Sequence, residues 1–370
     1  MKLIYLTSKK YPSTTADHLF VLSMARAFTS ILGDDFKLYI RGNSSSELNG
    51  VNTFSVNTTS RLRSVFYFFW IPIFVINNKH NNKRTVFFSN DPYLLSILIF
   101  WRKILRLKYL VCSDWHQLFE DWRDKYIALN SDYLISTSKK LRETILNTTQ
   151  ISENKILVAY GGADLQEFEN ISESVSELRK KLDLPVSDIL VGYVGFYKTM
   201  GMEKGLKTMI EALRFIQDKS VKMVFVGGRG GEIKEYQKMA EDMGVADRVI
   251  FERAMPKEAI PTYERTLDIL VIPYPDKPHF RHYGFPMKVY EYMASNKPII
   301  YSNLPIIAEI LADCGLSSNP DDSKDLADKI KSLINDPSVA HDLGSKALEK
   351  VESFTWQKRA QHIIDFIKSE

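Results

Sequence analysis

Strand-like and helix-like segments alternate along the whole chain, and this alternation limits its possible folds more than any other feature. Apolar runs of strand length recur between longer stretches with helical periodicity. They lie at 3–7, 37–41, 85–89, 109–113, 133–136 and 156–160, and again at 189–194, 222–226, 249–252, 269–272 and 298–301. Strands that alternate with helices form parallel sheets covered on both faces, so the pattern predicts an α/β protein of doubly wound, Rossmann-like domains.

The length of the chain predicts two such domains. Its 370 residues are enough for two hydrophobic cores. The polar segment 164–187 separates the two series of strands, so we expect an N-terminal domain of residues 1–165 and a C-terminal domain of residues 166–355. Ligands of open parallel sheets bind at the carboxyl ends of the strands, which favours a cleft between the two domains as the site.

Composition excludes several classes of protein. The two cysteines, Cys112 and Cys314, lie in opposite halves, so neither a disulfide framework nor a cysteine metal site is indicated. Residues 1–7 predict a first strand and not a secretion signal. We therefore expect a cytoplasmic protein, or a peripheral one on the cytoplasmic face of a membrane.

Positive charge is concentrated in residues 61–108, where nine Lys and Arg face the single acid Asp91. These residues flank the apolar runs 65–76 and 94–101. The first run is too short to span a bilayer, and Pro72 is expected to disturb it as a helix. Two interpretations remain open, namely a surface that lies on an anionic membrane and core helices with basic ends. No nucleic-acid-binding motif accompanies the charge, so nucleic acid is not an expected partner.

The segment 283–298 combines features of an anion site with one carboxylate. Gly284 and Pro286 predict a tight turn into a helix, whose first N–H groups favour a phosphate. Lys288 adds a full positive charge, whereas Glu291, about one turn further, suits hydrogen bonds from sugar hydroxyls. Phosphate and sugar together indicate a nucleotide sugar. The predicted donor-binding residues here are Gly284, Phe285, Pro286, Met287, Lys288 and Glu291.

Residues 286–294, Pro-Met-Lys-Val-Tyr-Glu-Tyr-Met-Ala, resemble the donor-binding helix of family 4 of the retaining glycosyltransferases with the GT-B fold. The resemblance implies two Rossmann-like domains facing a central cleft, and a C-terminal helix, 356–370, that crosses back to the N-terminal domain. That family typically carries two glutamates eight residues apart. Glu291 matches the second, which contacts the ribose, and Tyr283 occupies the place of the first, which touches the transferred sugar.

A second segment, 191–206, resembles the part of the family in which an arginine and a lysine clamp the donor diphosphate. Lys204 matches the lysine, but Phe196 stands where the arginine is expected. Gly195 belongs to the same turn, and Lys198 lies close enough in sequence to supply the missing charge. The resemblance therefore implies donor binding by Gly195, Lys198 and Lys204.

The glycine-rich turn within 225–232 alone would suggest a dinucleotide site, but its spacing does not complete G-x-G-x-x-G. The resemblance places this turn near the nucleotide, with Gly228 and Arg229 as donor-binding residues.

In the first half of the chain, Ser-Asp-Trp-His at 113–116 follows a predicted strand and so falls at the carboxyl edge of the sheet. It resembles the family's acid-x-histidine loop, which implies that His116 orients the donor sugar and is catalytic together with Lys204 and Glu291. The loop at 10–18 is assigned to the acceptor side. Its candidates are Tyr11, Thr14, Thr15 and His18, although helix capping explains the threonines equally well.

Together with the resemblance, these features predict a glycosyltransferase that moves a sugar from a nucleoside diphosphate sugar to a hydroxyl. The resemblance implies that the anomeric configuration is retained. No Asp-x-Asp motif is present, so we expect neither a metal nor another cofactor. A membrane-facing segment 61–108 would imply a lipid-linked glycan or glycolipid as the acceptor, in cell-surface polysaccharide or glycoprotein assembly. The departures at Tyr283 and Phe196 keep an alternative open, a catalytically weakened sugar-nucleotide-binding or scaffold subunit.

Overall fold

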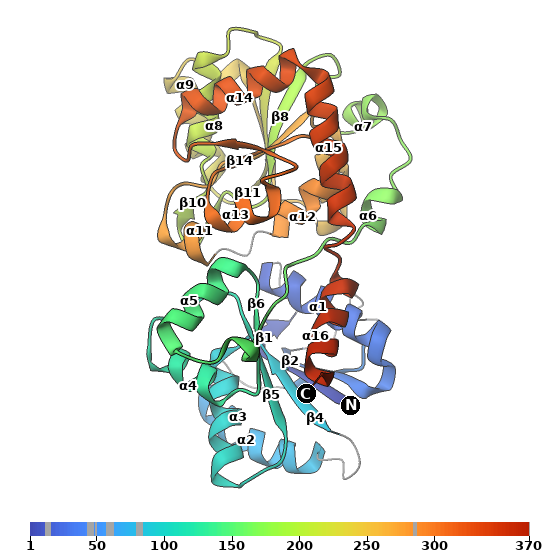
Figure 1. The fold of residues 1–370 in the computed structure, drawn as a ribbon. Coiled ribbons are helices and arrows are strands. Elements are labelled where there is room, and N and C mark those ends of the chain that lie inside the picture. The colour runs from blue at the N-terminus through green and yellow to red at the C-terminus, as the bar shows by residue number, and fades with distance from the viewer. Residues whose placement is uncertain are drawn as a thin grey trace. The chain divides into compact units, whose positions relative to one another are not determined.

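The computed structural model describes residues 1–11, 16–42, 48, 50–56, 63–78, 84–283 and 287–369. The chain divides into two compact units, each built on its own parallel sheet (Figure 1). The N-terminal unit consists of Met1–Tyr160 and Trp356–Glu370, and the C-terminal unit of Gly161–Thr355.

The N-terminal unit contains a seven-stranded parallel sheet of order β3-β2-β1-β4-β5-β6-β7. Its strands are β1 (Lys2–Tyr11), β2 (Phe36–Gly42), β3 (Thr53–Val56), β4 (Thr85–Ser89), β5 (Leu110–Trp115), β6 (Tyr133–Ser136) and β7 (Ile156–Val158). Strands β4 and β6 are buried along their whole length, as expected where helices cover both faces.

Two groups of helices accompany this sheet. The first group is α1 (Ala16–Leu32) and α16 (Trp356–Lys368), which pack against each other. The second group packs in chain order and comprises α2 (Arg63–Asn78), α3 (Pro92–Ile104), α4 (Trp122–Asn130) and α5 (Lys139–Thr149). The last helix of the chain thus completes the N-terminal unit, as the sequence predicted.

The C-terminal unit contains a six-stranded parallel sheet of order β12-β11-β8-β13-β14-β15 and a small antiparallel hairpin, β9-β10. The sheet strands are β8 (Ile189–Val194), β11 (Val221–Gly228), β12 (Val249–Arg253), β13 (Ile269–Ile272), β14 (Ile299–Ser302) and β15 (Leu316–Ser318). The hairpin strands are β9 (Lys198–Thr199) and β10 (Met202–Glu203).

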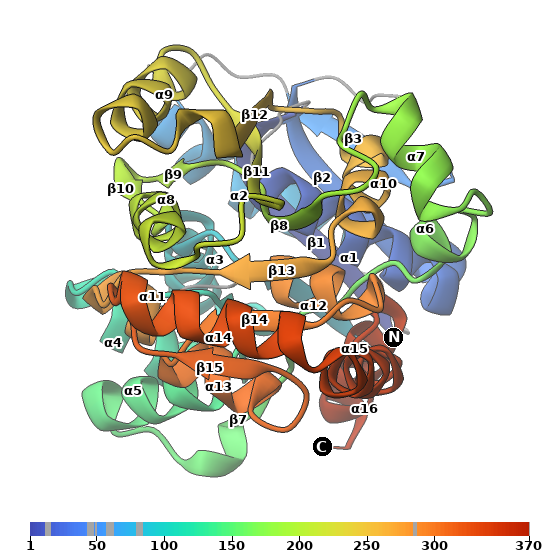
Figure 2. The same cartoon turned by 90° about the horizontal axis from the view of Figure 1, so that it is seen from above.

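Helices cover both faces of this second sheet. Figure 2 shows α8 (Leu206–Ala212), α9 (Glu232–Asp242) and α14 (Ser323–Asn335) on one face, and α10 (Ile260–Thr266), α12 (Met287–Ala294) and α15 (Pro337–Val351) on the other. The shorter helices are α6 (Gln166–Glu169), α7 (Val175–Lys181), α11 (Pro278–His282) and α13 (Pro305–Leu311). The predicted architecture of two Rossmann-like, doubly wound α/β sheets is confirmed.

Helix α2 corrects one expectation, because Pro72 lies inside it without ending it. A proline removes the N–H that would bond to the carbonyl four residues earlier, here the carbonyl of Phe68. The indole Nε1–H of Trp101, on the neighbouring α3, donates to that oxygen at 2.8 Å. A side chain from another helix therefore replaces the missing backbone donor, and α2 continues to Asn78.

Candidate functional site

The amine of Lys288 lies against the turn that follows β8. Lys288 is in the first turn of α12, and a Cβ placed on Gly195 would overlap its Nζ. The same Nζ is 5.1 Å from the centre of the Tyr193 ring. Burial lowers the pKa of Lys288, against the opposing fields of Glu291 and Glu264. Glycine at position 195, with φ +138°, leaves room for the amine in this position.

Lys204 reaches the same region from the loop before α8. Gly205, with φ +88°, passes so close to β13 that a Cβ there would overlap the carbonyl oxygen of Pro273, which explains a glycine at the start of this helix. Lys204 is half-buried and makes no ion pair with any described residue. Burial, with the charges of Lys288 and Arg229, lowers its pKa from 10.5 to about 7.

Arg229 is the third cation, in the turn after β11. Its guanidinium carbon is 3.2 Å from the centre of the Phe196 ring. The three predicted donor residues Lys204, Lys288 and Arg229 therefore act on one region at the carboxyl ends of β8 and β11, the edge where parallel sheets bind ligands. Gly228 precedes Arg229, and a Cβ there would overlap the side chain of Ile233.

Glu291 lies three residues beyond Lys288 on α12 and is half-buried. Its carboxylate makes no hydrogen bond or ion pair with any described residue, so its oxygens can accept from a ligand. The next residue fixes the helix, because the hydroxyl of Tyr292 accepts a hydrogen bond from the Val194 amide at 2.8 Å. The end of β8 and the face of α12 are thereby held together.

Glu264, on α10, is a residue of this region that the sequence did not single out. It is fully buried, and within the described part of the chain neither carboxyl oxygen has a hydrogen-bond partner. Burial, reinforced by the charge of Glu291, raises the pKa of Glu264 well above its usual value. A buried carboxyl group with a raised pKa therefore lies near Lys288 and Glu291, and no local motif around position 264 marks it.

Other predicted donor residues have different surroundings. Lys198 forms an ion pair with Glu235 of α9, with Nζ 2.8 Å from Oε2, and does not contribute to the lowered pKa of Lys204. Met287 is the first residue of α12 and is half-buried. The predictions for Gly284, Phe285 and Pro286 lie outside the described residues.

In the N-terminal unit, His116 follows β5 as predicted, and Asp114 orients it. Nε2 of His116 is 3.4 Å from an Asp114 oxygen, and its ring meets that of Phe20 edge-on at 4.4 Å. Arg359 of α16 donates to both Asp114 oxygens, at 2.8 and 2.9 Å. Although burial alone would raise the pKa of Asp114, Arg359 and His116 lower it. The sequence analysis did not single out Arg359. The signal that could have identified it is its position on the buried face of the final amphipathic helix.

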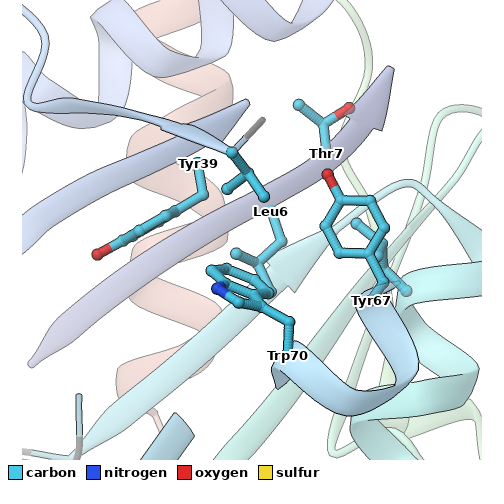
Figure 3. Close-up of a pocket in the computed structure, with 7 residues that line it drawn as sticks. Leu6, Thr7, Tyr39, Tyr67 and Trp70 are labelled. Atoms are coloured by element: carbon cyan, nitrogen blue, oxygen red, sulfur yellow. The ribbon is translucent and has the colours of Figure 1, made fainter. Parts of the chain in front are cut away.

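The predicted acceptor residues Tyr11 and His18 stack on each other, with ring centres 3.7 Å apart. Thr14 and Thr15 lie outside the described residues. A small apolar hollow elsewhere in the N-terminal unit contains none of the predicted acceptor residues (Figure 3). Its lining consists of Leu6, Thr7, Tyr39, Val56, Tyr67, Trp70 and Leu94.

Neither a metal-binding cluster nor a membrane-spanning helix is found among the described residues. They contain no group of three or more His, Cys, Asp or Glu side chains arranged to hold a metal ion. Among the same residues, no helix is both long and apolar enough to cross a membrane.

The two Rossmann-like units, each built on its own parallel sheet, define the fold of the protein as GT-B. The family model of the group 1 glycosyl transferases matches residues 174–350. The prediction of the GT-B fold is confirmed, and the match agrees with the group 1 resemblance of the sequence. The match covers most of the C-terminal unit, which contains Lys204, Arg229, Lys288 and Glu291.

Individual relatives are distant. A D-inositol 3-phosphate glycosyltransferase of Corynebacterium kroppenstedtii is 23% identical over 251 residues, covering 65% of this chain and 54% of that protein. The chain thus spans about half the length of the curated relatives it matches. The structure of Anabaena Alr3699/HepE in complex with UDP has a TM-score of 0.79 at 17% identity, covering 100% of both chains. The apo lipopolysaccharide outer core galactosyltransferase WaaB has a TM-score of 0.73 at 15% identity, covering 100% of this chain and 99% of that one.

Proposed function

We propose that this protein transfers a sugar from a nucleoside diphosphate sugar to a hydroxyl acceptor. The observation that carries the proposal is Lys204, a half-buried amine whose pKa is lowered to about 7 because burial and two further cations disfavour its charge. Cations that disfavour one another's charge are unfavourable together, and a diphosphate bound beside them would relieve this cost. The carboxylate of Glu291, nearby on α12, is suited to bind ribose hydroxyls.

The proposed mechanism uses charge stabilisation without an enzymic nucleophile. Lys204, Lys288 and Arg229 neutralise the diphosphate as it leaves, with help from the first N–H groups of α12. The acceptor attacks the face that the diphosphate leaves, so the anomeric configuration is retained, and a phosphate oxygen receives the acceptor proton. Three side-chain cations make a metal ion unnecessary in this scheme. His116, oriented by Asp114, is proposed to position the donor sugar.

Binding and product analysis test this proposal. UDP and UDP-glucose are the first donor probes, because the Anabaena neighbour is in complex with UDP and with UDP-glucose, and GDP and dTDP sugars complete the panel. Donor binding is expected to raise the melting temperature of the native protein. Lys204→Ala and Glu291→Ala should abolish the shift, whereas Lys207→Ala, at an exposed lysine paired with Glu211, should preserve it.

The anomeric configuration of the product, read by NMR, distinguishes the stereochemical outcomes. A product with the donor's configuration supports retention, and an inverted product refutes it. Transfer that is unaffected by EDTA supports metal independence, and a requirement for an added divalent cation refutes it. Failure of the native protein to bind any nucleoside diphosphate or its sugar would contradict the proposed function as a whole.

A weakened sugar-nucleotide-binding or scaffold subunit is the second candidate. The observation that favours it is Tyr283, which takes the place of the glutamate expected to touch the transferred sugar. Such a subunit would bind the donor through Lys204 and Glu291 without turning it over. Slow donor hydrolysis or transfer that is lost in the Lys204→Ala and Glu291→Ala variants would exclude it.

We further propose a lipid-linked glycan or glycolipid as the acceptor, and peripheral binding to the cytoplasmic face of a membrane. Support comes from α2, where Val65, Phe69, Ile73 and Ile76 form a helical stripe that is 54 to 62% exposed. An apolar stripe of this size on an otherwise packed helix is typical of an interaction surface. The lipopolysaccharide galactosyltransferase among the structural neighbours agrees with a role in cell-surface polysaccharide assembly.

The neighbouring helix α3 adds apolar and basic groups to this surface. The ring centre of Phe100 is 5.5 Å from that of Phe68 on α2, and Ile104 is 59% exposed. Lys103, Arg106 and Lys108 are exposed at the carboxyl end of α3. Apolar side chains bordered by lysine and arginine match an anionic bilayer surface.

Sedimentation with vesicles tests the membrane proposal. The native protein should bind phosphatidylcholine vesicles that contain phosphatidylglycerol more strongly than pure phosphatidylcholine. The double variant Phe69→Ser/Ile73→Ser should lose this binding, whereas Val339→Ser/Leu348→Ser, at exposed apolar positions of α15, should keep it. Equal transfer to a water-soluble acceptor such as inositol phosphate, together with indifference to vesicles, would refute it.

A further inference from the structure

Arg359 of α16 and His116, in the loop after β5, contact the same carboxylate. Nη2 of Arg359 is 2.8 and 2.9 Å from the two oxygens of Asp114. Nε2 of His116 is 3.4 Å from one of these oxygens. Asp114 lies near the end of β5, and none of its side chain is exposed. A permanent cation and a titratable ring therefore share one buried negative charge.

The N-terminal unit holds the guanidinium in a buried setting. Nη1 of Arg359 donates to the carbonyl oxygens of Ala159 and Tyr160, the second at 3.0 Å. Its Cζ is 5.3 Å from the centre of the Phe20 ring, which meets the His116 ring edge-on. Only 1% of the Arg359 side chain is exposed. Buried charges are screened little, so the charge of Arg359 acts strongly on its neighbours.

This charge determines the ionisation of Asp114. Burial alone would raise the pKa of the carboxyl group, but Arg359 and then His116 lower it below its usual value. The carboxyl group is therefore ionised at neutral pH although it is buried. Cys112, on the same strand, adds no charge, because burial and the Asp114 carboxylate raise the pKa of its thiol.

The charge of Arg359 also opposes a second proton on the His116 ring. A charged ring would lie close to a like charge and would share its counter-ion with the guanidinium. Without Arg359, the ring itself would have to supply the positive charge that the buried Asp114 needs. The difference matters for binding, because a charged ring has N–H donors only, whereas a neutral ring keeps one nitrogen as an acceptor.

We propose that Arg359 is a positioning residue for His116, which neutralises Asp114 so that the carboxylate orients the ring without drawing a second proton onto it. This inference rests on the proposed function, in which His116 positions the donor sugar, because a neutral ring can accept a hydrogen bond from a sugar hydroxyl. Arg359 acts on the sugar only through Asp114 and His116.

NMR titration of the His116 ring in the ligand-free protein tests this role, with its resonances assigned by their absence in His116→Gln. In Arg359→Met, the midpoint of the titration should rise by roughly 1–2 pH units, because a like charge is removed and the carboxylate is left to the ring. Arg359→Lys keeps a positive charge and should hold the midpoint close to the native one. Asp114→Asn removes the attraction and should lower the midpoint.

Two further variants separate this role from a loss of stability. In the Asp114→Asn background no buried carboxylate is left without a partner, so Asp114→Asn/Arg359→Met should melt at a higher temperature than Arg359→Met. Its midpoint should lie above that of Asp114→Asn, because a like charge is again removed. Arg102→Met, which removes a half-buried ion pair with Asp132 in the same unit, is the control and should leave the midpoint unchanged.

Kinetics connects the ring to the reaction. The acidic limit of kcat for turnover of the donor should move to higher pH in Arg359→Met, together with the midpoint. The affinity for UDP should stay unchanged, because Lys204 and Lys288, which are proposed to bind the diphosphate, belong to the C-terminal unit.

Three outcomes overturn the inference. They are a midpoint that does not rise on loss of Arg359 in either background, failure of Arg359→Lys to hold the native midpoint although it melts like the native protein, and an acidic limit of kcat that does not follow the midpoint. A native protein that neither binds UDP nor turns over any donor overturns the proposed function itself. That failure is distinguishable, because the midpoints are measured without ligand and still decide the electrostatic role of Arg359.

Discussion

Replacement of Lys204 by methionine should make the ligand-free protein more stable while removing its donor binding. Folding lowers the pKa of this amine from 10.5 to about 7, mainly through burial and then through Lys288 and Arg229. Below pH 7, both states carry the proton, and the folded state bears the full cost of a charge in an unfavourable place. Methionine has a similar length and no charge, so it removes that cost.

The magnitude follows from the size of the shift. A fall of 3.5 units, 10.5 minus 7, corresponds to about 5 kcal/mol at 1.36 kcal/mol per unit, which is an upper limit. Water reaches part of the half-buried side chain, so we expect a gain of roughly 1–3 kcal/mol in the free energy of unfolding. For a unit of this size that is about 3–9 °C in melting temperature.

The dependence on pH gives the prediction a distinctive signature. Between pH 7 and 10.5 the unfolded chain binds more protons at Lys204 than the folded protein, so native stability rises with pH in that window. The advantage of the methionine variant should therefore shrink from pH 7 towards pH 10.5. Lys207→Met, at an exposed lysine, is the matched control and should change stability by less than about 0.5 kcal/mol. Lower stability of Lys204→Met at pH 7, or a gain that does not change with pH, would refute the reasoning.

Three other predictions concern both units. UDP should bind with the uptake of up to one proton at pH 8–9, because the diphosphate raises the pKa of Lys204 from about 7. Calorimetry in buffers of different ionisation enthalpy measures this uptake, which should vanish in the Lys204→Arg variant. Arg359→Met should cost about 3–5 kcal/mol by leaving Asp114 buried without its guanidinium partner. Because the folded pKa of Asp114 is lowered, the contribution of this pair should be lost in acid unfolding of the native protein, as pH falls below 3.8 through that folded value. Trp101→Phe should cost about 1–3 kcal/mol in urea unfolding, because it deprives the Phe68 carbonyl of α2 of its donor. Adding Pro72→Ala should restore much of that loss by returning a backbone N–H. Equal stability of Trp101→Phe and of the double variant Trp101→Phe/Pro72→Ala would contradict this account.

Local sequence patterns predicted the elements but not the contacts between distant segments. The alternation of strands and helices was sufficient for both sheets, and the motifs around Lys204 and Lys288 identified two amines that act on one region. The stacking of Arg229 on Phe196 depends on which strands pair, and the donor that compensates Pro72 comes from another helix. Neither contact produces a periodic pattern in the sequence from which it could be predicted.

The sequence also did not predict the surroundings of two buried carboxyl groups. Glu264 lies in a short helix whose pattern does not mark it as buried, and the raised pKa of its carboxyl group follows only from the packing around it. Asp114 was recognised as part of the loop at His116, but its guanidinium partner lies 245 residues away. The roles proposed for the site residues remain predictions that the variants above test.

The position of α16 has a consequence for the order in which the protein matures on the ribosome. Arg359 is synthesised after the entire C-terminal unit, yet its guanidinium neutralises a carboxylate buried at the end of β5 in the N-terminal unit. Until that residue emerges, the nascent N-terminal sheet contains Asp114 without this partner and lacks its last covering helix. The first unit to be translated is thus the last to be completed, and it stays exposed to chaperones and proteases while its successor folds.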